Sequence, residues 1–145
     1  MKPSEFFSNE DKLEITRAIQ EAELNTSGEI RVHIESKCKG DALDRAAYIF
    51  KELNMHKTEL RNGVLFYMAI NDRKFAILGD AGINAVTPQN FWDDIKDVVF
   101  ENFNMGKFAQ GISEGILMAG EALNYNFPYQ DDDVNELSDD ISFGK

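Results

Sequence analysis

Residues 62–84 read NGVLFYMAINDRKFAILGDAGIN, a stretch that predicts the central hairpin of a sheet. Val64–Ile70 is an unbroken run of seven apolar residues, which is typical of a strand buried on both faces and covered by helices. Asn71–Asp72 then indicates a two-residue turn, although the usual glycine is missing. Phe75–Leu78 is expected to return antiparallel beside the first strand.

The upstream segment Glu29–Glu35, EIRVHIE, alternates strictly between apolar and polar residues, which predicts a strand with one buried face. A helix capped by Asp41 is expected to link this strand to the run at Val64–Ile70. A strand, a helix and a strand in that order form a right-handed crossover, so the two strands should be parallel. The predicted sheet therefore contains a parallel pair and an antiparallel hairpin.

Four helices are predicted from apolar stripes and terminal signals. They begin after Ser8, after Asp41, at Thr87–Pro88 and near Phe108. The third should run to about Phe103, and the fourth should end before Pro128. Within the fourth helix, Gly111, Gly115 and Gly120 lie close to the apolar stripe, and we expect them to allow close approach to the sheet or to a neighbouring helix.

The composition favours one α/β domain over residues 1–128, followed by an acidic tail at 129–145. The net charge of the 145-residue chain is −11, which argues against nucleic acid or an anionic membrane as a partner. From Gln130 onward the chain carries six acidic residues and one lysine, so we expect a solvated, mobile tail. Its apolar residues, which could instead dock it onto the domain, are Val134, Leu137, Ile141 and Phe143. Asp131, Asp133 and Asn135 lack the glycine and the glutamate of an EF-hand loop.

Other sequence features bear on the cellular location of the protein and on the catalytic motifs that it could carry. No signal peptide and no apolar run of about 20 residues is visible, so a full-length chain of this sequence would be cytoplasmic, without membrane insertion. Cys38 is the single cysteine and has no partner for an internal disulfide. No serine-nucleophile or phosphate-loop motif is present, and the catalytic residues are unknown. His33 and His56 are interpreted as structural.

Oxygen-bearing side chains are expected to gather at one end of the sheet. Glu29 begins one strand, Asn62 precedes its parallel partner, and Asp80 follows the return strand. Asp97 lies in the helix that follows. Carboxylate and amide oxygens without a compensating lysine favour a hard cation such as Ca²⁺ or Mg²⁺. The alternative, that these acids only face water, remains open, and it is preferred for Asp93 and Asp94, which would complement the helix dipole.

Several segments together resemble the TPM domain, a family that includes thylakoid lumen proteins of photosystem II repair and many bacterial proteins. They are TSGEIRVHI at 26–34, NGVLFYMAI at 62–70, DRK at 72–74, GDAGIN at 79–84, GKFAQGISEGILMAG at 106–120, and Asn126–Pro128. The resemblance implies a three-layer α/β/α sandwich, a divalent cation (calcium) in a cleft at the strand ends, and acid phosphatase activity. By position, the family's metal-site residues fall on Glu29, Asn62, Asn84 and Asp97, whereas Asp80 stands where many relatives have an aromatic residue.

Two functions follow as hypotheses. The first is a calcium-binding domain, with Mg²⁺ as a possible substitute, that acts as a monomeric interaction or regulatory module for an unidentified protein partner. The alternative is a metal-dependent acid phosphatase that hydrolyses phosphomonoesters. The first is preferred because no histidine is expected at the site to protonate a leaving group. In addition, Arg73 belongs to the far end of the hairpin, which leaves Arg61 as the nearby cation.

Overall fold

A small mixed sheet forms the centre of the molecule. The computed structural model describes residues 2–130 and 135–144. The strands of the sheet are β1 (Glu29–Glu35), β2 (Gly63–Ala69), β3 (Lys74–Gly79) and β4 (Ser142–Phe143). Their order is β3-β2-β1-β4. As predicted, β2 pairs parallel with β1 and antiparallel with β3.

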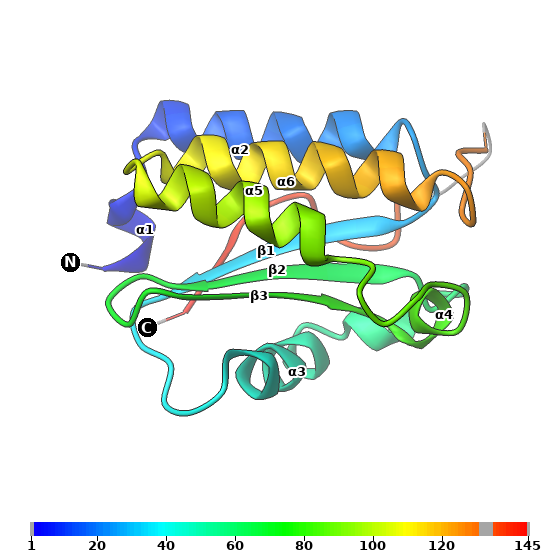
Figure 1. Cartoon of the computed structure of the whole chain (residues 1–145), viewed down its shortest axis with the longest axis horizontal. Coiled ribbons are helices and arrows are strands. Elements are labelled where there is room, and N and C mark those ends of the chain that lie inside the picture. The colour runs from blue at the N-terminus through cyan, green and yellow to red at the C-terminus, as the bar shows by residue number, and fades with distance from the viewer. Residues whose placement is uncertain (1, 131–134, 145) are drawn as a thin grey trace.

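Helices cover both faces of this sheet, so the predicted α/β/α sandwich is confirmed (Figure 1). The helices of the described residues are α1 (Pro3–Phe6), α2 (Asn9–Glu23), α3 (Ala42–Glu52), the 3-10 turn η1 (Met55–Lys57), α4 (Ala81–Asn84), α5 (Asp93–Asn104) and α6 (Phe108–Leu123). Helices α2, α5 and α6 lie over one face, and α3 lies over the other. No helix of the described residues is both long and apolar enough to cross a membrane.

The two faces of the sheet form two hydrophobic cores. All seven residues of β2 are buried, as its apolar run predicts. Val64 and Phe66 pack toward α2, α5 and α6, whereas Leu65 and Tyr67 pack toward α3. Because successive side chains of a strand point to opposite faces, one continuous apolar run supplies both cores.

Close packing of α6 depends on its glycines. A Cβ atom at Gly120 would lie 2.9 Å from the backbone of Ala22 in α2. A Cβ atom at Gly115 would lie 2.7 Å from the Val99 side chain in α5. Real side chains do not make such contacts, so these positions require glycine for α6 to approach both neighbouring helices.

Two predicted boundaries were wrong. The third long helix begins at Asp93 rather than at Thr87–Pro88, because the Thr87 hydroxyl donates a hydrogen bond back to the Ile83 carbonyl (2.8 Å) instead of capping a helix. The β2–β3 connection has four residues rather than two, since Ala69 pairs with Lys74. Arg73, within this connection, adopts a left-handed conformation with φ 52°.

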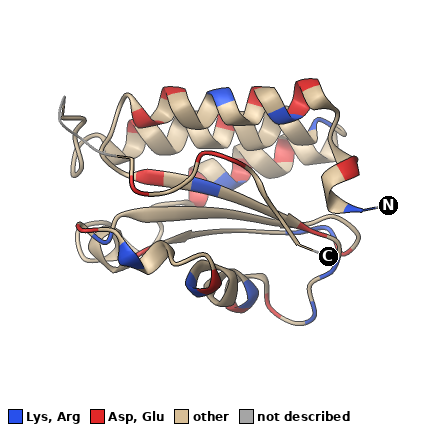
Figure 2. Ribbon diagram, turned by 180° about the vertical axis from the view of Figure 1, so that it is seen from behind, with Lys and Arg blue, Asp and Glu red and all other residues tan. Residues whose placement is uncertain are grey.

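The C-terminal segment, defined here as residues 135–144, lies along the open edge of β1 (Figure 2). His33 and Ile34 pair with Ser142 and Phe143, and the amide of Gly144 donates to the Ile34 carbonyl at 2.8 Å. This corrects the expectation of a solvated tail for residues 135–144, because their apolar side chains pack on the cores. Three residues make those contacts: Leu137, Ile141 and Phe143. Val134, named with them, lies outside the described residues.

Candidate functional site

The end of the sheet where β1 and β2 begin brings three predicted site residues together. The Glu29 amide donates to the Asn62 carbonyl at 3.2 Å, and the Asp80 amide donates to the Gly63 carbonyl at 2.9 Å. Glu29, Asn62 and Asp80 are 5%, 2% and 7% exposed. The parallel crossover and the antiparallel return therefore place these residues as predicted, with their side chains largely removed from water.

Asp80 is neutralised by a cation of its own chain. Its two carboxylate oxygens accept hydrogen bonds from Nε and Nη2 of Arg61 at 2.7 and 2.8 Å, and Oδ1 also accepts from the Ala81 amide. A bidentate guanidinium is a strong partner for a carboxylate. Arg61 reaches it from a left-handed backbone conformation with φ 52°. Asp80 is therefore not an unpaired charge awaiting a metal ion.

The two predicted amide ligands have their nitrogens engaged. Nδ2 of Asn62 donates to the Ser27 carbonyl, and Nδ2 of Asn84 donates to the Gly79 carbonyl, both at 3.1 Å. In each case the nitrogen holds the local backbone and the amide oxygen remains as an acceptor. Asn62 is buried, whereas Asn84 lies exposed at the end of α4. The two residues therefore differ in their access to an ion.

Asp97 lies on α5, outside the hydrogen-bonded residues at the sheet end. Its side chain is on the exposed face of α5, and among the described residues no hydrogen bond or ion pair joins it to Glu29 or Asp80. Within that part of the chain, no group of three or more histidine, cysteine, aspartate or glutamate residues is arranged to hold a metal ion. The expected set of five ligands is therefore assembled only in part.

Glu29 holds the C-terminal segment. Its Oε1 accepts hydrogen bonds from the backbone amides of Glu136 and Leu137, at 2.5 and 2.8 Å. Burial raises the pKa of the Glu29 carboxyl to about 7, while the two amides act in the opposite direction. The Leu137 side chain packs against the core on the α3 side of the sheet. A residue expected to bind a metal thus binds the chain's own C-terminal segment.

A second carboxyl beneath the segment was not predicted. Glu23, the last residue of α2, accepts a hydrogen bond from the Ile30 amide at 3.2 Å and shares a side-chain hydrogen bond with Asp139. Burial, together with Asp139, raises the pKa of Glu23 to about 9. At neutral pH Glu23 is therefore protonated and can donate to the Asp139 carboxylate. The sequence carried no signal for this pair, because it exists only when the segment docks.

His33 also binds the segment, at the other end of β1. Its Nδ1 lies 2.8 Å from the Ser142 hydroxyl, and its Nε2 lies 3.3 Å from Oε1 of Glu35. Glu35 also receives hydrogen bonds from Arg45 and Tyr67. Although burial acts to raise the pKa of Glu35, these donors hold it below its usual value, and burial lowers the pKa of His33.

The order serine, histidine, glutamate is that of a nucleophile, a base and an orienting acid. Here both His33 and Glu35 are buried, and Arg45 and Tyr67 occupy the Glu35 carboxylate. The imidazole and the carboxylate are withdrawn from solvent in this arrangement, and the group fixes β4 on β1. The interpretation of His33 as structural agrees with this arrangement.

Comparisons with known proteins find a matching family model and a similar solved structure. A family model described as the TPM domain matches residues 1–122. BA42 from the psychrophilic bacterium Bizionia argentinensis is similar in structure, with a TM-score of 0.92 and 46% identity, over 99% of each chain. The comparison with curated proteins gives no match.

Two more distant structures share the fold alone. One is the N-terminal domain of a P. gingivalis protein, with 19% identity and a TM-score of 0.69 over 86% of this chain and 80% of that one. The other is the N-terminal domain of cg2496 from Corynebacterium glutamicum, with 15% identity and a TM-score of 0.61 over 97% and 81%.

Proposed function

We propose that this chain, which belongs to the TPM domain family, is a calcium-binding interaction module in which the ion and the C-terminal segment compete for Glu29. One observation carries the proposal: Oε1 of Glu29 accepts hydrogen bonds from the amides of Glu136 and Leu137. A carboxylate that receives two donors already binds positive partial charge. A hard divalent cation is a stronger partner for the same oxygen.

The proposed ligand set uses the predicted residues, of which Glu29 and Asn62 are joined directly by a hydrogen bond in the described structure. Glu29 would supply the charged oxygen and Asn62 an amide oxygen, while Asn84 and Asp97, both exposed, carry oxygens that would complete the shell. Asp80 would support the loop through Arg61 instead of ligating the ion. Calcium accepts six to eight oxygens in flexible geometry, whereas magnesium demands a near-ideal octahedron, so calcium suits this mixed set better.

Release of the segment would open an interaction surface. The outer edge of β1 would lose its partner β4, and the apolar surface beneath Leu137 and Phe143 would be exposed. An unpaired strand edge with adjacent apolar sites recognises extended peptide segments. The partner in this proposal is therefore an extended, partly apolar protein segment. The monomeric state and the cytoplasmic location remain predictions.

Calorimetric titration of Ca²⁺ into the 145-residue protein tests the proposal. The wild type should bind, and Glu29→Gln should bind at least tenfold more weakly, because the charged oxygen is lost while the volume is kept. Glu52→Gln, at an exposed position at the end of α3, is the matched control and should bind like the wild type. Equal calcium affinity in Glu29→Gln and the wild type would contradict the proposal.

The second candidate, a metal-dependent phosphatase, has one observation in its favour. A cavity of about 270 Å³ under the segment is lined by Arg31 and Lys57, and Nε of Arg31 is buried without a hydrogen-bond partner in the described part of the chain. These cations could receive a phosphate. However, Glu136 lines the same cavity and would repel a phosphoryl group, and Arg61 is already paired with Asp80. The interaction module remains the better supported function.

A further inference from the structure

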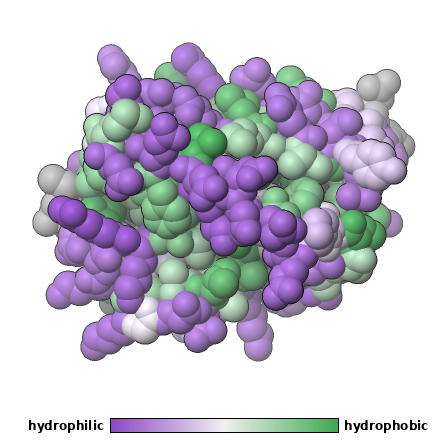
Figure 3. Space-filling view, viewed as in Figure 1, coloured by the Kyte–Doolittle hydropathy of each residue, from purple (hydrophilic) through white to green (hydrophobic). Residues whose placement is uncertain are grey.

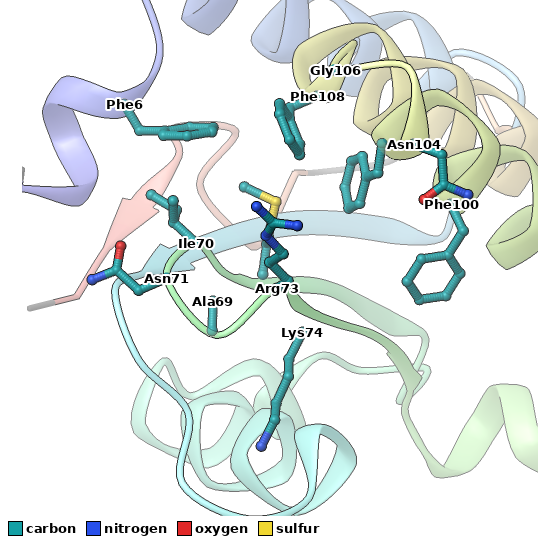
Figure 4. A pocket seen from close by; sticks show the side chains of 12 residues that line it. Phe6, Ala69, Ile70, Asn71, Arg73, Lys74, Phe100, Asn104, Gly106 and Phe108 are labelled. Atoms are coloured by element: carbon teal, nitrogen blue, oxygen red, sulfur yellow. The ribbon is translucent and has the colours of Figure 1, made fainter.

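A second region, at the hairpin end of the sheet, contains an open cavity of about 670 Å³ (Figure 4). It lies between the β2–β3 connection, α1, the end of α5 and the beginning of α6. Its apolar lining comprises Phe6, Met68, Ile70, Phe100, Phe103 and Phe108. Cavities of roughly 300–1,000 Å³ with mostly apolar linings are typical small-molecule sites.

The aromatic wall of this cavity is formed before any ligand enters. The ring centroids of Phe6 and Phe108 are 5.4 Å apart in an edge-to-face arrangement, and those of Phe103 and Phe108 are 5.2 Å apart. Phe75, beneath them in the core, contacts Phe103 at 5.6 Å. Because each ring is held by another, a ligand would not have to order them first.

The charge of the cavity is opposite to that of the molecule. The chain has a net charge of −11, and Figure 3 shows a largely hydrophilic surface with apolar side chains exposed between its polar groups. Yet the lining of this cavity includes Arg73 and Lys74 and no acidic residue. Nζ of Lys74 donates to the carbonyls of Cys38 and Gly40, and in Figure 4 its side chain points away from the cavity.

Arg73 supplies the available positive charge. Its guanidinium makes no hydrogen bond or ion pair with any residue that the structure describes, and Figure 4 shows its side chain rising toward the aromatic rings. The residue has φ 52°, a conformation that costs a side-chain-bearing residue about 1–2 kcal/mol and that glycine adopts freely. The turn itself does not require an arginine, and the exposed Arg73 side chain is available at the cavity.

We propose that this cavity binds a small carboxylate carrying an apolar chain or ring. The apolar part would lie among Phe6, Phe100, Phe103 and Phe108, and the carboxylate would pair with Arg73 at the mouth. Guanidinium binds carboxylate in a bidentate manner, and the aromatic wall removes the apolar part from water. This site lies at the opposite end of the sheet from Glu29 and does not depend on the calcium proposal.

Titrations of the 145-residue protein with octanoate, 1-octanol and acetate, followed by NMR, test the assignment. Octanoate should bind saturably and shift the amides of Arg73, Phe103 and Phe108. Octanol, which lacks the charge, and acetate, which lacks the chain, should each bind at least tenfold more weakly. Equal binding of octanoate and octanol, or no binding of octanoate, would overturn the proposal.

Three variants distinguish the binding role of the Arg73 guanidinium from the effect of the turn conformation on stability. Arg73→Gln should reduce octanoate affinity to that for octanol, and Arg73→Gly should do the same while leaving the Tm unchanged or higher, because glycine tolerates φ 52°. Arg17→Gln, at an exposed position on α2, removes the same charge elsewhere and should bind like the wild type. Wild-type octanoate affinity in both Arg73 variants would contradict the assignment.

Discussion

The two ends of the sheet differ in whether their charged side chains have partners within the described chain. At the end where β1 and β2 begin, Glu29 receives two amides and Asp80 receives Arg61, so each carboxylate has a partner within the chain. At the hairpin end, Arg73 has no partner among the described residues and lies over an open apolar cavity. A ligand at the first end must displace part of the protein, whereas a ligand at the second end needs only to enter. The first arrangement suits regulation, and the second suits simple binding.

The largest expected effect concerns calcium and thermal stability. A cation that binds only the folded state at one hundred times its Kd stabilises by about 2.7 kcal/mol, which corresponds to a rise in Tm of about 5–10 °C for a domain of this size. At a calcium concentration one hundred times the Kd of a chain ending at Tyr129, that chain should show this full rise, and the 145-residue chain should show a smaller one at the same concentration, because calcium must displace the C-terminal segment. Differential scanning calorimetry measures both. An equal rise in the two proteins would show that the segment and the ion do not compete.

A smaller loss of stability is expected when the internal partner of Asp80 is removed. Asp80→Asn keeps the volume but breaks the bidentate contact with Arg61, whose side chain is half exposed, so the cost should be about 1–2 kcal/mol. The Tm should fall by roughly 3–6 °C in thermal unfolding. Asp140→Asn, at an exposed position, is the control and should change little. An unchanged Tm for Asp80→Asn would mean that the pair contributes nothing to this end.

Docking of the C-terminal segment should weaken as pH rises. In the docked state the pKa of Glu23 is raised from 4.5 to about 9, and the pKa of Glu29 is raised from 4.5 to about 7. Above the ordinary carboxyl pKa of 4.5 and up to about pH 9, the docked state therefore binds more protons than the undocked state. The amide shift of Phe143, followed by NMR from about pH 5 to about pH 9, should move toward the undocked position.

Glu23→Gln sharpens this test, because its neutral amide imitates the protonated acid. The variant should stay docked in the upper part of the range, where the wild type releases the segment. Glu21→Gln, an exposed neighbour on α2, should titrate like the wild type. Docking that strengthens with pH, or an identical profile in Glu23→Gln and the wild type, would disprove the role given to the carboxyl pairs.

The smallest expected effect is catalytic. Hydrolysis of an activated phosphomonoester in the presence of Ca²⁺ or Mg²⁺ should be weak or absent, because Glu136 lines the cavity that holds Arg31 and Lys57 and would repel the phosphoryl group. A colorimetric assay of the purified protein measures it. Robust turnover that is lost in both Arg31→Gln and Asp97→Asn would favour the phosphatase over the interaction module.

Most of the sheet could be predicted because its signals are local. The apolar run of β2 and the alternation of β1 fixed two strands, and the crossover rule fixed their parallel pairing. Chain order then placed Glu29, Asn62 and Asp80 at one end. The start of α5 could not be predicted, because the Thr87 hydroxyl bonds backward to Ile83, an alternative that the sequence does not distinguish from a helix cap.

The missing parts of the site depend on long-range contacts. The C-terminal segment looks polar, and its few apolar residues dock only because β1 offers an open edge. Glu23 acquires its partner Asp139 from that docking, and Asp80 acquires Arg61 from a left-handed backbone conformation that has no clear sequence signal. Asp97 was assigned from its place in the following helix and again by resemblance, and the helix places it on an exposed face.

Amide hydrogen exchange at Glu136 and Leu137 tests the central claim most directly, because these two amides donate to Glu29. Without calcium, both amides should exchange slowly, like other hydrogen-bonded groups of the fold. With saturating calcium, both should exchange at nearly random-coil rates, while the amides of β2 remain protected. Slow exchange of Glu136 and Leu137 at saturating calcium, or fast exchange without calcium, would contradict competition for Glu29.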